Sequence, residues 1–408
     1  MRIAIIGSAF SGNKGAAAML ESSIQHLSAR NPEATFVHLS MYPVSDAKQN
    51  PYDNVTVMDA SPLRLGVAIN GGALAWRILP FLRGAIRKAV PEVGALADAD
   101  VLLDEGGITF VDGRGKFLIY NVASVLPALF VRTPVVKVAQ ALGPFTQASN
   151  RFWAKRILPR MAAIVSRGAI THEHLMGLGL TNVTTGADLA FTLKVAKADD
   201  KRATDAVDAT FFAGGDVVGI SPSQVLRKTF EAAGRDYIAE VAAQIDFVTE
   251  QLGRPVYLVA HSARPNDKLH NNDLPVCRDI YARVASPDKV LFPDAELDSQ
   301  VLRSLIGRCD LFVASRFHAM VSSLAMGVPT FVIGWSHKYR EVLDMFDLAH
   351  WAEGGTDVTN AVFEARVREL DADKAKIRAQ LKKKLPAVLK TALSQLDVIE
   401  AAAAAEGR

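Results

Sequence analysis

Short apolar runs alternate with helical patterns along most of the chain, and most runs end in a polar or glycine-rich turn. Residues 2–6 (RIAII) predict a strand, which is followed by the turn 7–15 and a helix over 16–29. The same order recurs up to about residue 191 and again over 217–360. Parallel strands that are buried on both faces give near-continuous apolar runs, so the pattern predicts an α/β protein with doubly wound sheets.

One break in this pattern divides the chain. Residues 194–213 are charged and lack periodicity, which is typical of a linker or a surface excursion. We therefore expect two Rossmann-like domains that face a cleft, an N-terminal one at 1–195 and a C-terminal one at 214–360. C-terminal helices are expected over 361–408.

The stretch 310–338 (DLFVASRFHAMVSSLAMGVPTFVIGWSHK) contains the most specific chemistry. It predicts a strand, a polar turn, a short helix and a second strand. Arg316 and His318 fall in the turn, where free N–H groups of the helix favour an anion, and His337 and Lys338 follow the second strand. These residue types suit a phosphate or a carboxylate. The alternative is a polar turn that only caps the helix or pairs with a surface acid.

Other predicted strands also end in polar side chains. In the first domain these are Asn13, Asp104, Glu105, Gln140 and Arg167, and in the second they are His261 and the loop 271–273. Ligands of open α/β sheets bind at the carboxyl ends of strands, which makes these residues candidates for binding. A structural role is the alternative, with Asp104 capping the segment that follows it. The first turn lacks the G-x-G-x-x-G spacing of dinucleotide-binding proteins.

Composition narrows the possible functions. The chain has 408 residues, half of them hydrophobic, and a net charge of only +3, which argues against a nucleic-acid-binding protein. Two cysteines, Cys277 and Cys309, provide neither a disulfide framework nor a metal cluster. The first residues do not read as a signal peptide, so a cytoplasmic protein is expected. No run is long and apolar enough to predict a transmembrane helix.

The segment 63–90 is apolar but contains five basic residues. One interpretation is a peripheral contact with the membrane surface, which would place the protein at the inner face of the membrane. The other interpretation, which we prefer from the sequence, is a pair of helices packed on a sheet with a cationic edge in water.

Five blocks resemble, in the same order, those of the polysaccharide pyruvyl transferase family, which has the two-domain GT-B fold. SGNKGA (11–16) resembles the family's opening Gly-Asn-x-Gly turn, and DEGGITFVD (104–112) resembles its glycine-rich second turn. QALGPF (140–145) is similar to its Gly-Pro block. SRGAITHEHLMGLGLTNVTTGADLAF (166–191) resembles its Arg-containing strand end with a downstream Asp. Residues 315–338 resemble the most specific signature, Arg-x-His-x(8)-Gly-x-Pro followed by an aromatic residue and a Lys. The resemblance covers about residues 3–350.

Two departures from the family pattern stand out. The family usually has an acidic residue after the opening turn, whereas here Gly15 is followed by three alanines, residues 16–18. The family's Arg-Asp pair is Arg167-Gly168 in this chain, which leaves the partner of Arg167 open.

The resemblance implies transfer of a pyruvyl group from phosphoenolpyruvate to a sugar, with a ketal formed across two hydroxyls. The acceptor would be a sugar or lipid-linked oligosaccharide of a cell-envelope glycan or exopolysaccharide. The enol carbon must be protonated while a hydroxyl attacks, and histidine suits this step because its ordinary pKa is about 6.5. No metal and no cofactor beyond the donor substrate are expected.

Roles follow for the candidate residues. Arg316 would hold the phosphate or carboxylate of the donor, and His318 would act as the general acid or base. Arg167 would reach the donor across the cleft, and Lys338 would add positive charge behind the leaving phosphate. His261 and its neighbouring loop would also face the cleft. The acceptor hydroxyls are assigned to Asn13, Asp104, Glu105 and Gln140.

Two other functions also fit the sequence. A GT-B glycosyltransferase would have the same fold and would place Arg316 and Lys338 on the diphosphate of a nucleotide sugar. The absence of an acidic ribose-binding residue shortly after the key Gly-Pro argues against it. A non-catalytic homologue that binds glycans or a partner enzyme would explain the three alanines, but the combination of Arg316, His318 and Lys338 argues against that function.

Overall fold

The chain divides into two α/β units in the computed structural model, which describes residues 1–264, 271–334 and 338–405. The first unit contains Met1–Ser11, Met19–Thr192 and the chain from Leu389 onward. The second unit contains Gly12–Ala18 and Leu193–Val388. Residues 12–18 therefore group with the second unit, which differs from the sequence-based division at 195.

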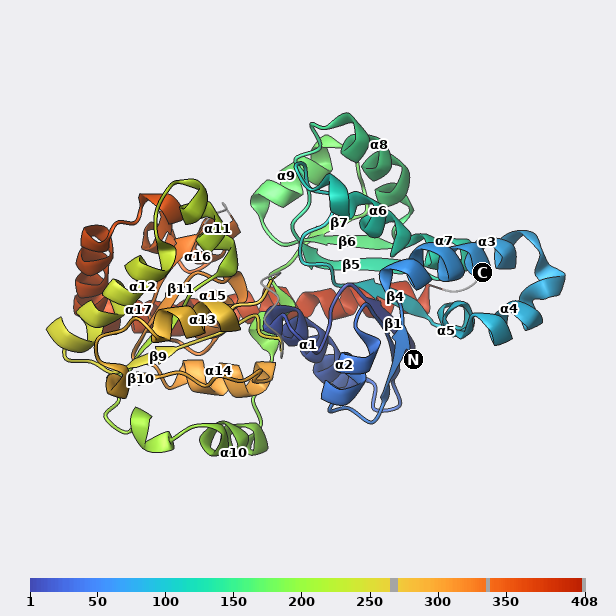
Figure 1. The fold of residues 1–408 in the computed structure, drawn as a ribbon. Coiled ribbons are helices and arrows are strands. Elements are labelled where there is room, and N and C mark those ends of the chain that lie inside the picture. Colours follow the sequence, from blue (N-terminus) through green and yellow to red (C-terminus); the bar gives the residue numbers. More distant parts are fainter. Residues whose placement is uncertain (265–270, 335–337, 406–408) are drawn as a thin grey trace. The chain divides into compact units, whose positions relative to one another are not determined.

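Seven parallel strands form the sheet of the first unit, in the order β3-β2-β1-β4-β5-β6-β7 (Figure 1). Their bounds are β1 Arg2–Ile6, β2 Thr35–Ser40, β3 Val55–Asp59, β4 Val101–Asp104, β5 Val135–Gln140, β6 Ala163–Ser166 and β7 Val183–Thr185. The helices are α1 Lys14–Arg30, α2 Pro43–Gln49, α3 Asn70–Ile78, α4 Arg83–Ala89, α5 Pro91–Asp98, α6 Gly115–Ala123, α7 Leu126–Val131, α8 Ala148–Ile157 and α9 Ala169–Gly177.

Both faces of this sheet are covered, which explains the continuous apolar runs. Successive residues of a strand point to opposite faces, and in β1 Ile3 and Ile5 join one buried cluster whereas Ala4 and Ile6 join another. Helix α1 and the end of the C-terminal helix cover the first face. Helices α3, α5, α6, α7 and α8 pack on the second face.

Six parallel strands form the sheet of the second unit, in the order β10-β9-β8-β11-β12-β13. Their bounds are β8 Val218–Ser221, β9 Val256–Leu258, β10 Val290–Leu291, β11 Leu311–Ala314, β12 Thr330–Gly334 and β13 Ala352–Gly354. The helices are α10 Lys197–Ala206, α11 Gln224–Ala232, α12 Tyr237–Asp246, α13 Leu274–Tyr281, α14 Ser299–Gly307, α15 Phe317–Ala325, α16 Lys338–Asp344 and α17 Asn360–Ala404. The α/β class, the two parallel sheets and the C-terminal helix confirm the fold expected from the sequence.

Two segments differ from the expectation in detail. The charged stretch read as a linker forms helix α10, which packs against α14. The C-terminal region is one 45-residue helix, α17, rather than several. Its residues up to Val388 belong to the second unit, and those from Leu389 belong to the first.

The strand order positions the candidate sites. In both sheets the order reverses direction beside the first strand, between β1 and β4 in one unit and between β8 and β11 in the other. At such a switch point, the chain segments that follow the two neighbouring strands pass to opposite faces of the sheet. In α/β proteins a crevice forms there, at the carboxyl ends of the strands. Glu105 follows β4 and Arg316 lies just beyond β11, so each belongs to such a point.

Candidate active site

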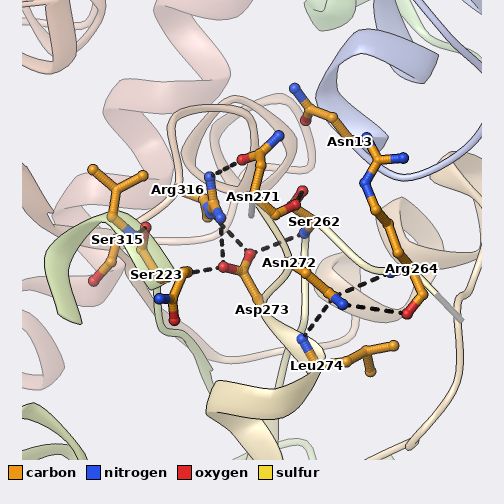
Figure 2. A network of polar contacts seen from close by, with 12 residues as sticks. Asn13, Ser223, Ser262, Arg264, Asn271, Asn272, Asp273, Leu274, Ser315 and Arg316 are labelled. Atoms are coloured by element: carbon orange, nitrogen blue, oxygen red, sulfur yellow. Dashed lines mark hydrogen bonds and ion pairs between the residues drawn. The ribbon is translucent and has the colours of Figure 1, made fainter. Parts of the chain in front are cut away.

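Arg316 is held by a carboxylate from a distant loop. It lies between strand β11 and helix α15, as the pattern of 310–338 predicted. Its Nε and one terminal nitrogen donate to the two carboxylate oxygens of Asp273, at 2.8 and 2.5 Å, and the other terminal nitrogen donates to Asn271 at 2.9 Å. Figure 2 shows this fork. Among the described residues these bonds occupy three of its five N–H donors.

Asp273 fixes the orientation of that guanidinium. Its side chain is fully buried and also accepts hydrogen bonds from the backbone N–H groups of Ser262 and Gln224, each at 3.0 Å. The carboxylate of Asp273 therefore links the segment that follows β8 with the segment that follows β9. Burial lowers the pKa of Arg316, but the charge and hydrogen bonds of Asp273 outweigh burial and leave that pKa above its ordinary value. Arg316 is therefore a fixed cation.

The segment 12–15 packs directly against this network. Asn13 forms a bridge with Ser262, and Lys14 donates its backbone N–H to the carbonyl of His261 at 3.3 Å. Asn13 also accepts from the backbone N–H of Gly15 at 3.1 Å, at the start of α1. Sequence reasoning had assigned Asn13 to the first domain with the acceptor residues. The structure places it in the second unit, near Arg264 in Figure 2.

His318 lies against the backbone of Gly15. A Cβ added at that glycine would lie 2.1 Å from Nδ1 of His318, so the imidazole occupies the space that any other residue would need. The requirement for glycine here comes from close approach and not from backbone conformation. The opening Gly-Asn-x-Gly turn and the Arg-x-His signature, 300 residues apart, thus form one side of the same site.

Cations surround His261, which is buried at the end of β9. Burial lowers the pKa of His261 well below its ordinary value, and the charges of His318, Arg316, Arg303 and Lys14 lower it further. It is therefore a neutral imidazole near pH 7. Two of these basic groups have carboxylate partners, Arg316 with Asp273 and Lys14 with Glu296, so the charges next to His261 are of both signs.

Lys338 joins the same region from the start of α16. Its Nζ lies 5.0 Å from the ring centroid of Phe317 and 5.4 Å from that of Tyr339. The ring of His318 lies 5.0 Å from the ring of Phe317. Phe317 is thus a shared neighbour of Lys338 and His318. His337, the other candidate beyond β12, lies outside the described residues.

A pocket of about 420 Å³ opens at the carboxyl ends of β12 and β13. This volume is within the range of about 300–1,000 Å³ that is typical of small-molecule sites. Its lining residues include Arg340, Glu353, Asp357, Thr229 and Thr356, and Glu353 also pairs with Arg366 at 3.5 Å. Carboxylate and hydroxyl side chains are suited to a ligand with several hydroxyl groups.

The first unit contains a separate buried network at its own switch point. Asp104 forms an ion pair with Lys137, and both side chains are almost fully buried. Gln140 donates to the backbone carbonyl and the carboxylate of Asp104, and it accepts from Thr109 at 2.6 Å. Asp104 and Gln140 therefore lie in contact, with their polar groups bonded to each other and to neighbouring strands, and their role toward an acceptor stays a prediction.

Glu105 is the titratable group of this network. It is 1% exposed, and its carboxylate accepts a 2.5 Å hydrogen bond from Ser23 of α1. Burial raises the pKa of Glu105 to about 7, and the charges of Asp104 and Asp188 add to the rise, although the bond from Ser23 opposes it. A carboxyl group that titrates near neutrality is suited to proton transfer.

Arg167 has the partner that the sequence left open. It follows β6, and one terminal nitrogen donates to Asp188 at 2.9 Å, with both side chains buried. The downstream Asp of the 166–191 block is therefore that partner. The role of Arg167 toward the donor stays a prediction.

Sequence reasoning missed the ionic partners in the second unit. Asp273 had been included only as part of the loop 271–273, with no role as the partner of Arg316. Lys14, which pairs with Glu296 at 2.8 Å, was not singled out at all. In both pairs the partners lie more than 40 residues apart, and no local pattern indicates them.

Comparison with known proteins identifies the family to which these residues belong. The sequence profile of the family described as polysaccharide pyruvyl transferase matches residues 13–337, which include both the Asn13 turn and the Arg316 signature. The amylovoran biosynthesis protein AmsJ of Erwinia amylovora is 23% identical over 384 residues, which cover 90% of this chain and 91% of that protein.

Solved structures share the fold at low sequence identity. A UDP-GlcNAc 2-epimerase from Neisseria meningitidis bound to UDP-GlcNAc has a TM-score of 0.65 at 10% identity, over 98% of this chain and 100% of that one. The MnaA protein of S. aureus, solved with UDP, has a TM-score of 0.63 at 11% identity, over 98% and 96%. At such identities the likeness shows the fold alone.

Proposed function

The chain belongs to the polysaccharide pyruvyl transferase family, and on this basis we propose that it transfers a pyruvyl group from phosphoenolpyruvate to a sugar. The product would be a ketal on a cell-envelope glycan or exopolysaccharide. The similarity to an amylovoran biosynthesis protein supports an acceptor of the polysaccharide class.

One observation supports the donor assignment most strongly. Arg316, His318 and Lys338 belong to one side of the second unit, around Phe317 and the first turn of α15. Phosphoenolpyruvate has a phosphate and a carboxylate, and a fixed guanidinium beside a helix N-terminus suits either group. Asp273 and Asn271 accept from three of the five N–H donors of Arg316, and among the described contacts the other two remain for a ligand.

The proposed reaction balances without a cofactor. A proton adds to the methylene carbon of the donor, which becomes a methyl group, while one sugar hydroxyl adds to C2. The C2–O bond to phosphate then breaks, and a second hydroxyl of the same sugar closes the ketal. In the overall balance, one of the two hydroxyl protons ends on the methyl carbon and the other ends on the released phosphate.

We assign the first proton transfer to His318. Its ring is positioned by Gly15 and Phe317, next to the fixed cation Arg316. Lys338 would stabilise the charge of the leaving phosphate, and Arg167 would add a further donor contact. The acceptor hydroxyls are assigned to Asn13 and to the first-unit residues Asp104, Glu105 and Gln140. Of these, Glu105 is the one whose pKa of about 7 allows it to exchange a proton.

The test measures phosphate release from phosphoenolpyruvate in the presence of candidate glycan acceptors. Wild-type protein should release phosphate only when an acceptor is present, and His318→Ala should lower kcat by at least about a hundredfold, as expected for loss of a general acid. Exposed His350→Ala, on the same unit, is the control and should keep wild-type turnover. Near-normal turnover of His318→Ala would remove that residue from the mechanism.

A nucleotide-sugar glycosyltransferase is the second candidate, and the pocket beside β13 favours it. Glu353 and Asp357 line that pocket, where their carboxylates could pair with ribose hydroxyls, and no motif in the sequence indicated such an acidic site. A thermal-shift comparison separates the candidates. Stabilisation by phosphoenolpyruvate and not by UDP or GDP sugars supports the pyruvyl transferase; the reverse result supports the glycosyltransferase. A non-catalytic glycan-binding homologue would show neither phosphate release nor glycosyl transfer.

A further inference from the structure

Exposed apolar side chains are concentrated on one part of the first unit. Among the described residues, 13 of the 14 large hydrophobic side chains that are exposed belong to this unit, and Met326 alone belongs to the other. Six of the 13 lie in the segment 63–90: Leu63, Val67, Leu74, Ile78, Phe81 and Leu82. We call this segment the basic hairpin. It consists of η1 (Arg64–Ile69), α3, η2 (Pro80–Leu82) and α4.

The basic hairpin has two distinct sides. Leu65, Ile69, Ala73 and Trp76 are buried against the sheet and anchor it to the unit. Its other side is open to solvent, where Leu63 is 78% exposed and Phe81 is 80% exposed. In Figure 1 the connection between α3 and α4 projects from the body of the first unit. The sequence interpretation of helices packed on a sheet therefore describes only the inner side.

Positive charge is concentrated in the same part of the chain. Between Asp59 and Glu92 there are five basic residues and no acidic one. Residues 60–172 contain 14 basic and six acidic residues, whereas the rest of the chain has 32 basic and 37 acidic ones. The small net charge of +3 thus conceals a strongly basic segment in the first unit.

Two of the five basic residues are paired with carboxylates, Arg64 with Glu92 at 2.6 Å and Arg87 with Asp98. Arg83 and Arg87 each lie 5.5 Å from the ring of Trp76. Exposed Arg77 and Lys88 have no ion pair among the described residues. Helix α6 packs beside η1 and contains the further exposed residues Lys116, Phe117 and Ile119.

We propose that the basic hairpin is a docking surface for an anionic lipid bilayer. A surface that combines protruding Phe and Leu side chains with Arg and Lys residues inserts its apolar groups at the headgroup boundary while its charges bind anionic lipids. A protein partner or a second copy would require a complementary acidic surface. A zwitterionic bilayer has no net charge for the Arg and Lys residues to bind, so only the apolar side chains would contribute to its binding. Among the described residues no helix is long and apolar enough to cross a membrane, so the contact would be peripheral.

The test is co-sedimentation of the full chain with vesicles. One set contains phosphatidylcholine alone, and the other contains equal parts of phosphatidylcholine and phosphatidylglycerol. The partition coefficient should be at least about tenfold higher for the anionic vesicles and should fall steeply with added salt, because the attraction is screened. No binding to the anionic vesicles would overturn the proposal.

Two variants of exposed residues separate the apolar and charged contributions. Ile78→Ser with Phe81→Ser, and separately Arg77→Glu with Lys88→Glu, should each lower binding to the anionic vesicles by at least about fivefold. Val44→Ser on α2 and Lys228→Glu on α11 are the matched controls, and they should bind like wild type. Equal losses in the hairpin and control variants would contradict the proposal.

The same variants test the other occupants. Circular dichroism melts should coincide for all variants, since the substituted side chains are exposed. If light scattering showed a dimer that Ile78→Ser with Phe81→Ser dissociates, while the vesicles bound no wild-type protein, the surface would belong to a second copy and the lipid proposal would be refuted. The outcome is independent of phosphate release from phosphoenolpyruvate, so a failure of one proposal leaves the other standing.

Discussion

Glu105→Gln should change how the stability of the protein depends on pH. Glu105 is completely buried at the switch point of the first sheet, and its pKa rises from 4.5 to about 7 on folding. At about 1.4 kcal/mol per pKa unit, this rise corresponds to about 3 kcal/mol of differential stability. The neutral amide of Gln removes the titration while keeping nearly the same shape.

The sign follows from the direction of the shift. An acid whose pKa is raised by folding binds its proton more tightly in the folded state than in the unfolded one. The contribution of Glu105 to the free energy of unfolding is therefore fully present below the unfolded pKa of 4.5, and it is lost as the pH rises through the folded pKa of about 7. Relative to wild type, Glu105→Gln should gain about 2.5 kcal/mol between pH 5 and pH 8.

Urea unfolding followed by tryptophan fluorescence measures this difference. Wild type and variant are compared at pH 5, 6, 7 and 8, so that the titration of all other groups cancels. Glu173→Gln, an exposed substitution on α9, is the control and should give a difference that does not change with pH. A flat difference for Glu105→Gln as well would refute the argument that burial raises the pKa of this group.

Three further substitutions test the second unit. Asp273→Asn should cost about 3 kcal/mol of unfolding free energy, measured by urea denaturation, because it leaves the guanidinium of Arg316 without its countercharge; a loss below about 1 kcal/mol would contradict the buried ion pair. Arg316→Lys should raise the KM for phosphoenolpyruvate at least about tenfold in steady-state kinetics, since Lys cannot form the bidentate contact, and an unchanged KM would exclude Arg316 from donor binding. Gly15→Ala should lower kcat/KM at least about tenfold by displacing the ring of His318, while Gly177→Ala, where an added Cβ meets nothing within 4 Å, should be neutral.

The sequence predicted the two sheets because their strands are covered on both faces. A strand such as residues 2–6 then reads as an uninterrupted apolar run, and each polar turn marks the carboxyl end of a strand. Arg316 and Glu105 could be identified in this way, since both follow such runs directly. The local pattern is sufficient when the functional residue adjoins its own strand.

Long-range pairing could not be predicted in the same way. Asp273 and Arg316 are separated by 43 residues, and their contact depends on how β9 and β11 are placed in the sheet. The grouping of Asn13 with the second unit could not be predicted for a similar reason. Its segment follows a first-unit strand in the chain, but it bonds to residues 261–263 of the second unit. The pKa of Glu105 likewise depends on burial that only the folded unit produces.

Direct detection of the pyruvylated product tests the proposed function most sharply. Purified protein, phosphoenolpyruvate and a library of glycan acceptors are incubated together, and each acceptor is analysed by mass spectrometry. We predict that one acceptor gains the mass of one pyruvate less one water, with one phosphate released for each product and no product formed by His318→Ala. A glycosyl group gained from a nucleotide sugar, or full product formation by His318→Ala, would contradict it.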